Sequence, residues 1–266
     1  MSLTFCSLFS GSSGNATYIG SGKTGILIDA GLSGRQIVDA LARINVLPET
    51  LSGIVITHEH SDHVKGAGIL SRKYRLPLYA NERTWEAMAR QVGPVSPSER
   101  RVFESDSDFY IGDLSLHAFK IPHDAADPVG FRIWAGSRSV ATATDMGCVR
   151  KSVMTALGGT DLVLLESNHD PAMLMRNDHY SAALKRRILG DHGHLSNEAC
   201  CRGILTLYES GVRRLVLGHL SAENNTPQLA LDTALEAVTR EGLTPDEDIF
   251  LDLGWRDRPG TLYTID

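Results

Sequence analysis

A short polar segment, HEHSDH, concentrates histidines and acids directly after an apolar run. Imidazole nitrogens and carboxylate oxygens are ligands that borderline divalent metal ions bind well in proteins. His58 and His60 are two residues apart, so at the end of a strand both side chains point to the same side. Asp62 and His63 follow where a turn can direct them to a second point nearby. The segment therefore predicts a metal centre with ligands for two neighbouring ions.

Further candidates for the same chemistry lie at the ends of other predicted strands. His123, Asp145 and His219 each come after a stretch rich in apolar residues, which is typical of a buried strand. A lone histidine at a strand end is usually a structural residue with a hydrogen-bond partner, and a histidine-rich surface turn without function is the alternative for HEHSDH. Several such residues at strand ends, together with HEHSDH, rarely occur by chance in one chain. We therefore expect all of these side chains to meet at one edge of the fold.

The elements that would position these residues alternate between strands and helices. An apolar strand at 24–31 precedes a helix at 33–44. Residues 101–145 predict a meander of strands, after which the alternation resumes with a helical stretch at 171–210. We therefore expect an α/β (α+β) fold in which two sheets pack face to face between helix layers. No repeat or clear linker interrupts the pattern, so we expect residues 1–266 to form a single domain.

The overall composition limits the possible partners. The formal net charge of −6 gives no general attraction to a polyanion, so any nucleic-acid contact must come from a local basic patch or from bound metal. No stretch approaches the roughly 20 apolar residues that span a bilayer, and the N-terminus lacks the pattern of a signal peptide. The four cysteines show no CxxC spacing. We expect a cytoplasmic protein without a membrane segment.

The ordered set of motifs resembles the metallo-β-lactamase superfamily over nearly the whole chain. The resemblance rests on Asp29, HEHSDH, His123, Asp145 and His219, in that order. It implies an αββα sandwich with two divalent ions, zinc, manganese or iron, at one edge. It also implies a role for each residue. One ion would be held by His58, His60 and His123, the other by Asp62, His63 and His219, with Asp145 bridging both and Asp29 steadying the metal loop.

A second set of motifs is similar to nucleases of that superfamily. The segment GHLS at 193–196, followed by a predicted helix and strand, resembles the nuclease branch. DLVLLES resembles the acid-bearing strand of tRNA-processing nucleases, with Glu166 as the acid, although no histidine precedes it here. FSGSSGNATYI, LIDAGLSGRQI and ESNHD resemble the YycJ-type (WalJ) subfamily. That subfamily is associated with 5′-to-3′ exonuclease action on double-stranded DNA, which makes DNA the expected partner.

The chemistry expected from this resemblance is phosphodiester hydrolysis. Two divalent ions about 3.5–4 Å apart clamp a phosphodiester and lower the pKa of a shared water, whose hydroxide attacks phosphorus. Asp62 and Asp145 are the candidates for orienting it. His194, supported by Glu166, is the candidate proton donor to the leaving 3′-oxygen. The alternative for His194 is a structural residue beside a helix cap.

Several other residues keep two interpretations at this stage. Basic runs on either side of His194 are either solvated faces or phosphate contacts, and their candidates are Lys185, Arg186, Arg187, Arg213 and Arg214. His169 lies near the site by resemblance but in an exposed loop by default, and Cys148 follows Asp145 although no thiolate is required there. The SGSSGN segment predicts a hairpin turn in which Asn15 is a minor candidate for substrate contact, and Trp255 is expected in the core.

Two other functions compete with a nuclease. One is a small-molecule hydrolase of the same fold that acts on a thioester, a lactone or a cyclic phosphodiester. The other is a non-catalytic metal-binding regulatory protein, which the complete set of candidate ligands disfavours. Residue types alone do not distinguish between the possible metals, DNA and RNA, the two polarities, exonuclease and endonuclease action, or oligomeric states.

Overall fold

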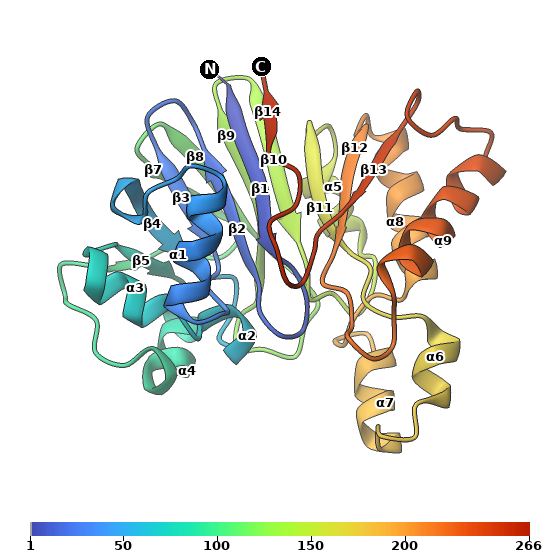
Figure 1. The fold of residues 1–266 in the computed structure, drawn as a ribbon, viewed down its shortest axis with the longest axis horizontal. Coiled ribbons are helices and arrows are strands. Elements are labelled where there is room, and N and C mark those ends of the chain that lie inside the picture. Colours follow the sequence, from blue (N-terminus) through green and yellow to red (C-terminus); the bar gives the residue numbers. More distant parts are fainter. Residues whose placement is uncertain (1) are drawn as a thin grey trace.

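The strands of the protein form two seven-stranded sheets in the computed structural model, which describes residues 2–266 (Figure 1). Across the first sheet the order is β14 (Tyr263–Ile265), β1 (Leu3–Phe9), β2 (Ala16–Gly20), β3 (Gly25–Ile28), β4 (Leu51–Val55), β5 (Leu78–Ala80) and β6 (Arg100–Val102). Across the second it is β13 (Phe250–Leu253), β12 (Arg214–Gly218), β11 (Leu162–Glu166), β10 (Arg138–Ala143), β9 (Val129–Ala135), β8 (Leu114–Lys120) and β7 (Ser107–Ile111).

Helices cover the outer faces of both sheets, and two of them project from the sandwich (Figure 1). The first sheet is covered by α1 (Gly34–Arg43), α3 (Ala67–Tyr74) and α4 (Glu82–Val92), with α2 (Ser61–Val64) at its lower edge and a short 3₁₀ helix at Pro48–Thr50. The second is covered by α5 (Lys151–Leu157), α8 (Asn197–Glu209) and α9 (Pro227–Arg240). The projecting helices are α6 (Pro171–Arg176) and α7 (Ala182–Leu189).

A shared apolar core holds the two sheets together. Phe5 and Ile26 of the first sheet are fully buried in one cluster with Leu116 and Phe131 of the second. Separate clusters lie between each sheet and its helices. Because burial of apolar surface is the main favourable contribution to folding, these three layers of contact account for the αββα sandwich expected from the sequence.

Strand direction brings the ends of many strands to one edge of the sandwich. In the first sheet, β3, β4, β5 and β6 are parallel neighbours. In the second, β10, β11, β12 and β13 are parallel, and β8 runs the same way as β10 because both are antiparallel to β9. The carboxyl ends of parallel strands meet at a common edge, where α/β proteins commonly place their functional sites.

Two expectations about the elements need correction. The predicted meander over 101–145 is only partly right, because β6 pairs in parallel with β5 and so belongs to the first sheet. The helical stretch at 171–210 is interrupted: α6, α7 and α8 are separate helices, and α7 buries none of its residues. Between residues 2 and 266, none of the helices has the length and apolar composition to cross a membrane.

Candidate metal centre

The expected site residues emerge from the carboxyl ends of strands in both sheets. Asp29 follows β3, Asp145 comes shortly after β10, and His219 follows β12. All three have left-handed backbone conformations, with φ of 62°, 62° and 54°. Non-glycine residues adopt this region rarely and at some cost in free energy, and such strain is concentrated at functional sites. The local reversal of the backbone turns each side chain toward the common edge.

Three histidines form the first cluster, which comprises His58, His60 and His123. The Nδ1 atom of His60 lies 3.1 Å from Nε2 of His58 and 3.2 Å from Nε2 of His123. A tetrahedral ion with metal–nitrogen bonds of about 2.0–2.1 Å separates its ligand nitrogens by about 3.3 Å. The spacing of the three nitrogens therefore fits a zinc-sized ion.

Acidic residues enter the second cluster, which comprises Asp62, His63, Asp145 and His219. The Nε2 atom of His63 lies 3.3 Å from Oδ2 of Asp145 and 3.5 Å from Oδ2 of Asp62. Within residues 2–266, the buried Oδ2 of Asp145 and Nε2 of His219 have no hydrogen-bond partner. Buried polar atoms without partners are costly, so a cation between these atoms would satisfy them.

Asp145 faces both clusters. Its Oδ1 lies 3.7 Å from Nε2 of His123, whereas its Oδ2 lies 3.3 Å from Nε2 of His63. The side chain is 2% exposed; Oδ2 faces the second cluster, whereas Oδ1 lies between His123 and Nδ1 of His219, which is 3.4 Å away. This is the arrangement that a carboxylate bridging two ions requires.

Partners outside the two clusters hold the imidazole rings in place. The carboxylate of Asp29 accepts hydrogen bonds from Nδ1 of His63 (2.7 Å) and from the backbone and side chain of Thr57 (2.9 and 2.8 Å). Nδ1 of His123 donates to the carbonyl of Gly193 at 3.2 Å. A proton fixed on Nδ1 leaves the Nε2 lone pair free for a metal, which is how carboxylate–histidine pairs tune metal sites.

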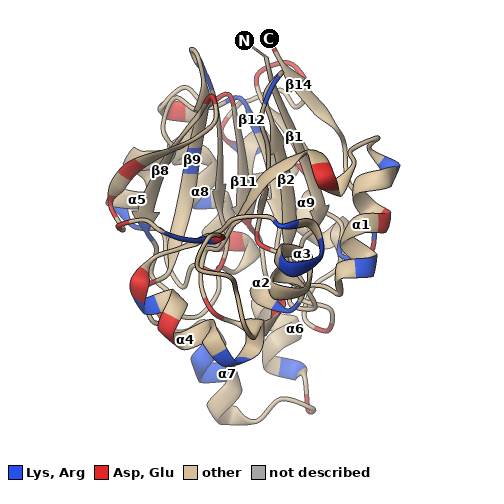
Figure 2. Ribbon diagram, turned by 90° about the vertical axis from the view of Figure 1, so that its left-hand side faces the viewer, with Lys and Arg blue, Asp and Glu red and all other residues tan. Residues whose placement is uncertain are grey.

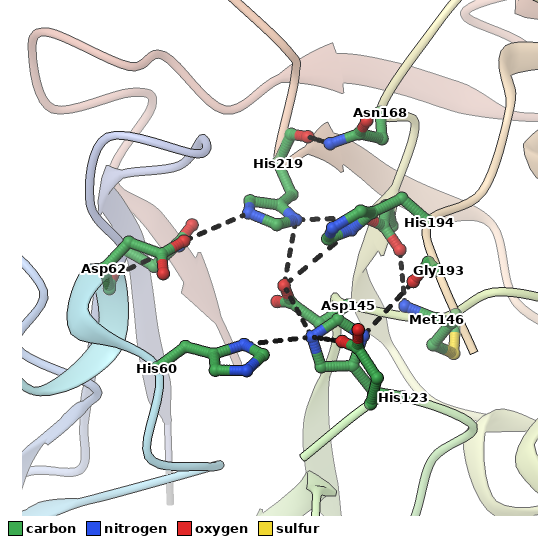
Figure 3. A network of polar contacts seen from close by, with 12 residues as sticks. His60, Asp62, His123, Asp145, Met146, Asn168, Gly193, His194 and His219 are labelled. Atoms are coloured by element: carbon green, nitrogen blue, oxygen red, sulfur yellow. Dashed lines mark hydrogen bonds and ion pairs between the residues drawn. The ribbon is translucent and has the colours of Figure 1, made fainter. Parts of the chain in front are cut away.

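Glu166 joins the second cluster to His194. Its Oε1 accepts hydrogen bonds from Nδ1 of His194 (2.7 Å) and Nδ1 of His219 (2.9 Å), and its Oε2 accepts from the backbone N–H of Met146. Figure 3 shows His194 and His219 side by side above Asp145. Burial raises the pKa of Glu166, but its bonds and charge interactions with the two histidines outweigh burial, and the net shift is downward. Glu166 is therefore a charged anchor rather than a proton donor.

The two clusters hold their imidazoles in different protonation states. Burial lowers the pKa of His58 well below its usual value, and it also lowers the pKa of His123. Burial opposes charge at His63 as well, but the carboxylates around it, led by Asp145, raise its pKa well above the usual value. Asp145 and the other acidic neighbours likewise raise the pKa of His219 to about 10.

Asn15 lies against the second cluster, although its sequence context indicated a turn and only a minor chance of substrate contact. Its Nδ2 lies 3.1 Å from Nε2 of His63 and 3.5 Å from Oδ2 of Asp62. Its Oδ1 accepts the backbone N–H of Gly11 at 3.0 Å, which fixes the orientation of the amide. The side chain therefore presents a donor, not a ligand oxygen, to the centre. No spacing rule reveals it, because the contact depends on the turn folding onto the loop that contains Asp62.

The basic candidates separate into two groups. Arg187 on α7 forms an ion pair with Asp124, whose neighbour His123 is in the first cluster. Figure 2 shows the basic residues of α7 at the end of the molecule where the two helices project. Arg213 and Arg214 lie at the amino end of β12, and His219 follows its carboxyl end, so strand length separates them from the centre. Arg187 is therefore connected to the first cluster through Asp124, whereas Lys185 donates to the carbonyl of Met175 and these two arginines lie away from the centre.

Three residues with open interpretations have definite positions. His169 is 1% exposed, so the default expectation of a solvent-exposed loop is wrong, and burial lowers its pKa to about 4. Cys148 is partly buried and lies in none of the candidate metal clusters of residues 2–266. Trp255 is half-buried at a loop and packs against the apolar core between the second sheet and its helices.

Known proteins share both the sequence and the fold. The model of the beta-lactamase superfamily domain matches residues 24–220. Exodeoxyribonuclease WalJ of Streptococcus pneumoniae is 42% identical over 89% of this chain and 88% of its own length. Exodeoxyribonuclease YycJ of Bacillus anthracis is 37% identical over 91% of both chains.

Solved structures with little sequence identity have the same fold. The metallo-beta-lactamase fold protein YhfI of Bacillus subtilis matches with a TM-score of 0.73 at 16% identity, over 97% of this chain and 99% of its own. Human tRNase Z, short form, matches with a TM-score of 0.63 at 18% identity, over 98% and 99%. With the two His/Asp clusters at one edge of an αββα sandwich, the chain belongs to the metallo-β-lactamase superfamily and, within it, to the family of the WalJ and YycJ proteins.

Proposed function

We propose that this protein is a two-metal phosphodiesterase that degrades double-stranded DNA as a 5′-to-3′ exonuclease. The observation that carries the proposal is the position of Asp145, whose carboxylate lies between two clusters of metal-binding side chains. Relatives that share 37–42% of their residues with almost the whole chain are named exodeoxyribonucleases, which supports DNA as the substrate.

The residues present fit a pair of divalent ions. His58, His60 and His123 would hold one ion, and Asp62, His63 and His219 the other, with Asp145 between them. Two ions held in this way supply charge stabilisation to a phosphodiester and acidify a water molecule. The nitrogen and oxygen ligands suit zinc, manganese or iron.

Asp62 and Asp145 divide the task of orienting the attacking water. Asp62 is the more accessible carboxylate, with 23% of its side chain exposed against 2% for Asp145. Asp62 can therefore accept a hydrogen bond from a water that approaches from solvent. The buried Asp145 instead lies between the two clusters and fixes their relative position. Fixed acceptors of this kind lower the barrier by placing the nucleophile near its line of attack.

His194 is positioned to protonate the leaving 3′-oxygen. Its Nδ1 donates to Glu166, so its Nε2 is free to face the substrate, and 20% of the side chain is exposed. Its ring centroid lies 5.1 Å from that of His219 and 5.2 Å from that of His123, so the ring borders both clusters. A positioned proton donor of this kind contributes roughly 10²–10⁴ to the rate.

The arm formed by α6 and α7 supplies the nucleic-acid surface in this proposal. Lys185, Arg186 and Arg187 lie on α7, and the backbone N–H of His194 donates to the carbonyl of Ile188 at the end of that helix. The basic residues therefore lie beside the candidate proton donor. Because the chain has a net charge of −6, a local patch of this kind is needed to attract the DNA backbone.

We include the cytoplasm as the site of action. The four cysteines are free thiols, and adjacent Cys200 and Cys201 pack in the core of the second helix layer. Burial raises the pKa of the Cys6 thiol to about 12 and that of Cys201 to about 11, so both stay protonated. A chain that keeps thiols without disulfides suits a reducing compartment.

The test is cleavage of end-labelled polynucleotides by purified protein with measured metal content. Duplex DNA, single-stranded DNA and RNA are compared with added Mn²⁺ or Zn²⁺, each labelled at the 5′ or the 3′ end. We expect early release of the 5′ label from duplex DNA, with the 3′ label retained in long products. Turnover of small esters or lactones without cleavage of any polynucleotide would overturn the proposal.

A further inference from the structure

Asp124, beside the first cluster, has no role in the proposed chemistry so far. Its Oδ1 lies 3.5 Å from Nε2 of His123, the nitrogen that faces the other histidines of that cluster. The ligand atoms of a tetrahedral ion are about 3.3 Å apart, so Asp124 lies at nearly the spacing of a further ligand. Among residues 2–266, however, Asp124 belongs to none of the candidate metal clusters. The carboxylate is therefore close to the first cluster without being part of it.

Both oxygens of Asp124 are paired with Arg187 of α7. Nε of Arg187 donates to Oδ2, and the amino group Nη2 donates to Oδ1 at 3.1 Å. Oδ1, the oxygen nearest to His123, is thus shared with the guanidinium. A two-pronged pair of this kind fixes the orientation of a carboxylate, so Arg187 competes with any ion in the first cluster for Asp124.

Backbone contacts fix the end of α7 against the first cluster. The backbone N–H of His194 donates to the carbonyl of Ile188 at 2.9 Å. A Cβ atom on Gly193 would clash with the carbonyl oxygens of Arg187 and Ile188, so this close approach requires glycine. The carbonyl of Gly193 in turn accepts from Nδ1 of His123. The backbone that positions the arginine is therefore fixed relative to the histidines of the first cluster.

The pair is nevertheless accessible from solvent. The side chain of Arg187 is 54% exposed and that of Asp124 is 33% exposed, against 1% for His123. A phosphate oxygen can therefore reach the guanidinium without entering the metal centre. Arginine forms the same two-pronged bonds with phosphate as with carboxylate, so a DNA backbone on α7 would compete with Asp124 for Arg187.

The other acid beside the first cluster is less suited to such an exchange. Glu59 lies between His58 and His60 in the chain, but its Oε1 accepts the backbone N–H of Ala126 at 2.8 Å. Moving Glu59 would break a bond within the fold, whereas a partly exposed ion pair such as that of Asp124 exchanges partners at little cost.

We propose that Asp124 is a further carboxylate ligand for the ion of the first cluster, which Arg187 withholds until a DNA backbone phosphate replaces Asp124 on the guanidinium. This inference rests on the proposed exonuclease function and extends it to the control of the metal centre. Binding of DNA to the arm thereby strengthens ion binding where the strand is cut. Because coupling between two binding sites is reciprocal, an ion in the first cluster in turn releases Arg187 for DNA.

The first test measures ion binding without DNA. Competition with a chromogenic chelator gives the affinity of the ion that His60→Ala removes. We expect R187Q to raise this affinity about fivefold, the upper range for a partly exposed ion pair, because Asp124 is then free to bind the ion. Arg186→Gln is the matched control, since it removes the same charge from the adjacent position of α7, where the described residues 2–266 provide no ion pair. The control should have the smaller effect.

Asp124→Asn decides whether the carboxylate carries the effect. In that background, R187Q and Arg186→Gln should change the ion affinity equally, because only the general effect of charge remains. The visible spectrum of the Co²⁺-loaded protein reports coordination itself: R187Q should weaken the absorption, as an added ligand does, and R187Q/D124N should restore it. An R187Q effect no larger than that of the control, an effect that persists with Asp124→Asn, or an unchanged spectrum would overturn the inference. Should R187Q fold poorly, Arg187→Lys decides instead, because it keeps the charge but loses the two-pronged pair and should still raise the affinity.

A second test measures the binding of duplex DNA to the metal-free protein in EDTA. Asp124→Asn should tighten binding about fivefold, since Arg187 is then free for phosphate, and R187Q should cancel this gain. Asp178→Asn, which removes an exposed acid between α6 and α7, is the control and should have the smaller effect. If Asp124→Asn does not exceed the control, the exchange on Arg187 is wrong while the exonuclease function stands. If the wild-type protein neither binds nor cleaves any polynucleotide, the proposed function fails and with it the role of DNA, whereas the ion affinities still decide whether Asp124 is a ligand.

Discussion

The two metal-binding clusters lie side by side, yet their surroundings shift the pKa values of their histidines in opposite directions. The first contains only imidazoles, and burial lowers the pKa of His58 and His123, so these ligands are neutral without an ion. The second contains acids, and these raise the pKa of His63 and His219. An ion can enter the first cluster without displacing protons from those two rings, whereas in the second it must displace protons that the carboxylates hold.

This difference has a physical origin in the position of Asp145 and its neighbours. Asp62 and Asp29 both lie against His63, so negative charge accumulates around the second cluster. At the first cluster, His123 has one oxygen of Asp124 at 3.5 Å and one of Asp145 at 3.7 Å, and Asp124 is itself paired with Arg187. The first cluster therefore offers nitrogen ligands alone, whereas the second combines nitrogen with carboxylate oxygen.

The largest effect is expected from removing a ligand of the first cluster. His60→Ala should abolish turnover and also remove one ion per chain, because two imidazoles cannot complete the site. Metal content by mass spectrometry and cleavage of duplex DNA measure the two outcomes. His117→Ala is the control, since His117 lies on β8 and pairs only with Asp108. Full ion content in His60→Ala would mean that His60 is not a ligand.

His194→Ala should separate chemistry from metal binding. We expect kcat to fall by roughly 10²–10⁴ with both ions retained, because Nδ1 of His194 is bonded to Glu166 at 2.7 Å and lies farther, 3.8 Å, from Oδ1 of Asp145 in the second cluster. The measurement is single-turnover cleavage together with metal content. If the substitution removes an ion, the side chain is a ligand, and its role as proton donor is wrong.

The pH dependence of ion binding should distinguish the two clusters. Since the pKa of His219 is about 10 in the metal-free protein, a proton competes with the ion at every lower pH. Affinity of the second cluster should therefore rise about tenfold per pH unit for each proton displaced, from pH 6 upward. His58 and His123 are already neutral in that range, so they add no slope at the first cluster. Calorimetry in buffers of different ionisation enthalpy measures the number of protons released when each ion binds. Equal numbers for the two ions would contradict the proposed difference between the clusters.

Asp29→Asn should weaken the second cluster selectively. The carboxylate of Asp29 holds Nδ1 of His63 directly at 2.7 Å, whereas it reaches His58 of the first cluster only through the hydroxyl of Thr57. Loss of such a partner typically lowers metal affinity by about 10–100-fold. Competition with a chromogenic chelator should therefore show one weakened ion and one unchanged ion. Weakening of both would show that the clusters are not independent.

Asn15→Ala should have the smallest effect, again confined to the second cluster. The amide donates toward the backbone carbonyl and the carboxylate of Asp62, and one hydrogen bond contributes about 0.5–1.5 kcal/mol, so affinity should fall by up to about tenfold. Ser12→Ala, an exposed change in the same turn, is the control. Unchanged affinity in Asn15→Ala would confine its role to holding Gly11.

Local patterns predicted most of the elements and the clustering of the candidate ligands. HEHSDH combines ligand types that no core accepts without partners, and the apolar runs before His123, Asp145 and His219 placed them at strand ends. Local patterns gave the wrong sheet where the choice of partner strand decides which sheet a strand joins. β6 resembles the first strand of a meander, but its pairing with β5 places it in the other sheet. Proximity in sequence also misled: Arg213 is near His219 along the chain but at the other end of β12.

The sequence by itself determined the kinds of ligand, their order along the chain and the periodicities of the elements that contain them, because these depend on residue type and local spacing. Only the tertiary structure decided which groups meet. The position of Asp145 between two clusters and the contact of Asn15 with the loop of Asp62 both join segments far apart in the chain. Such contacts are set by the packing of two sheets against each other, which no local pattern encodes.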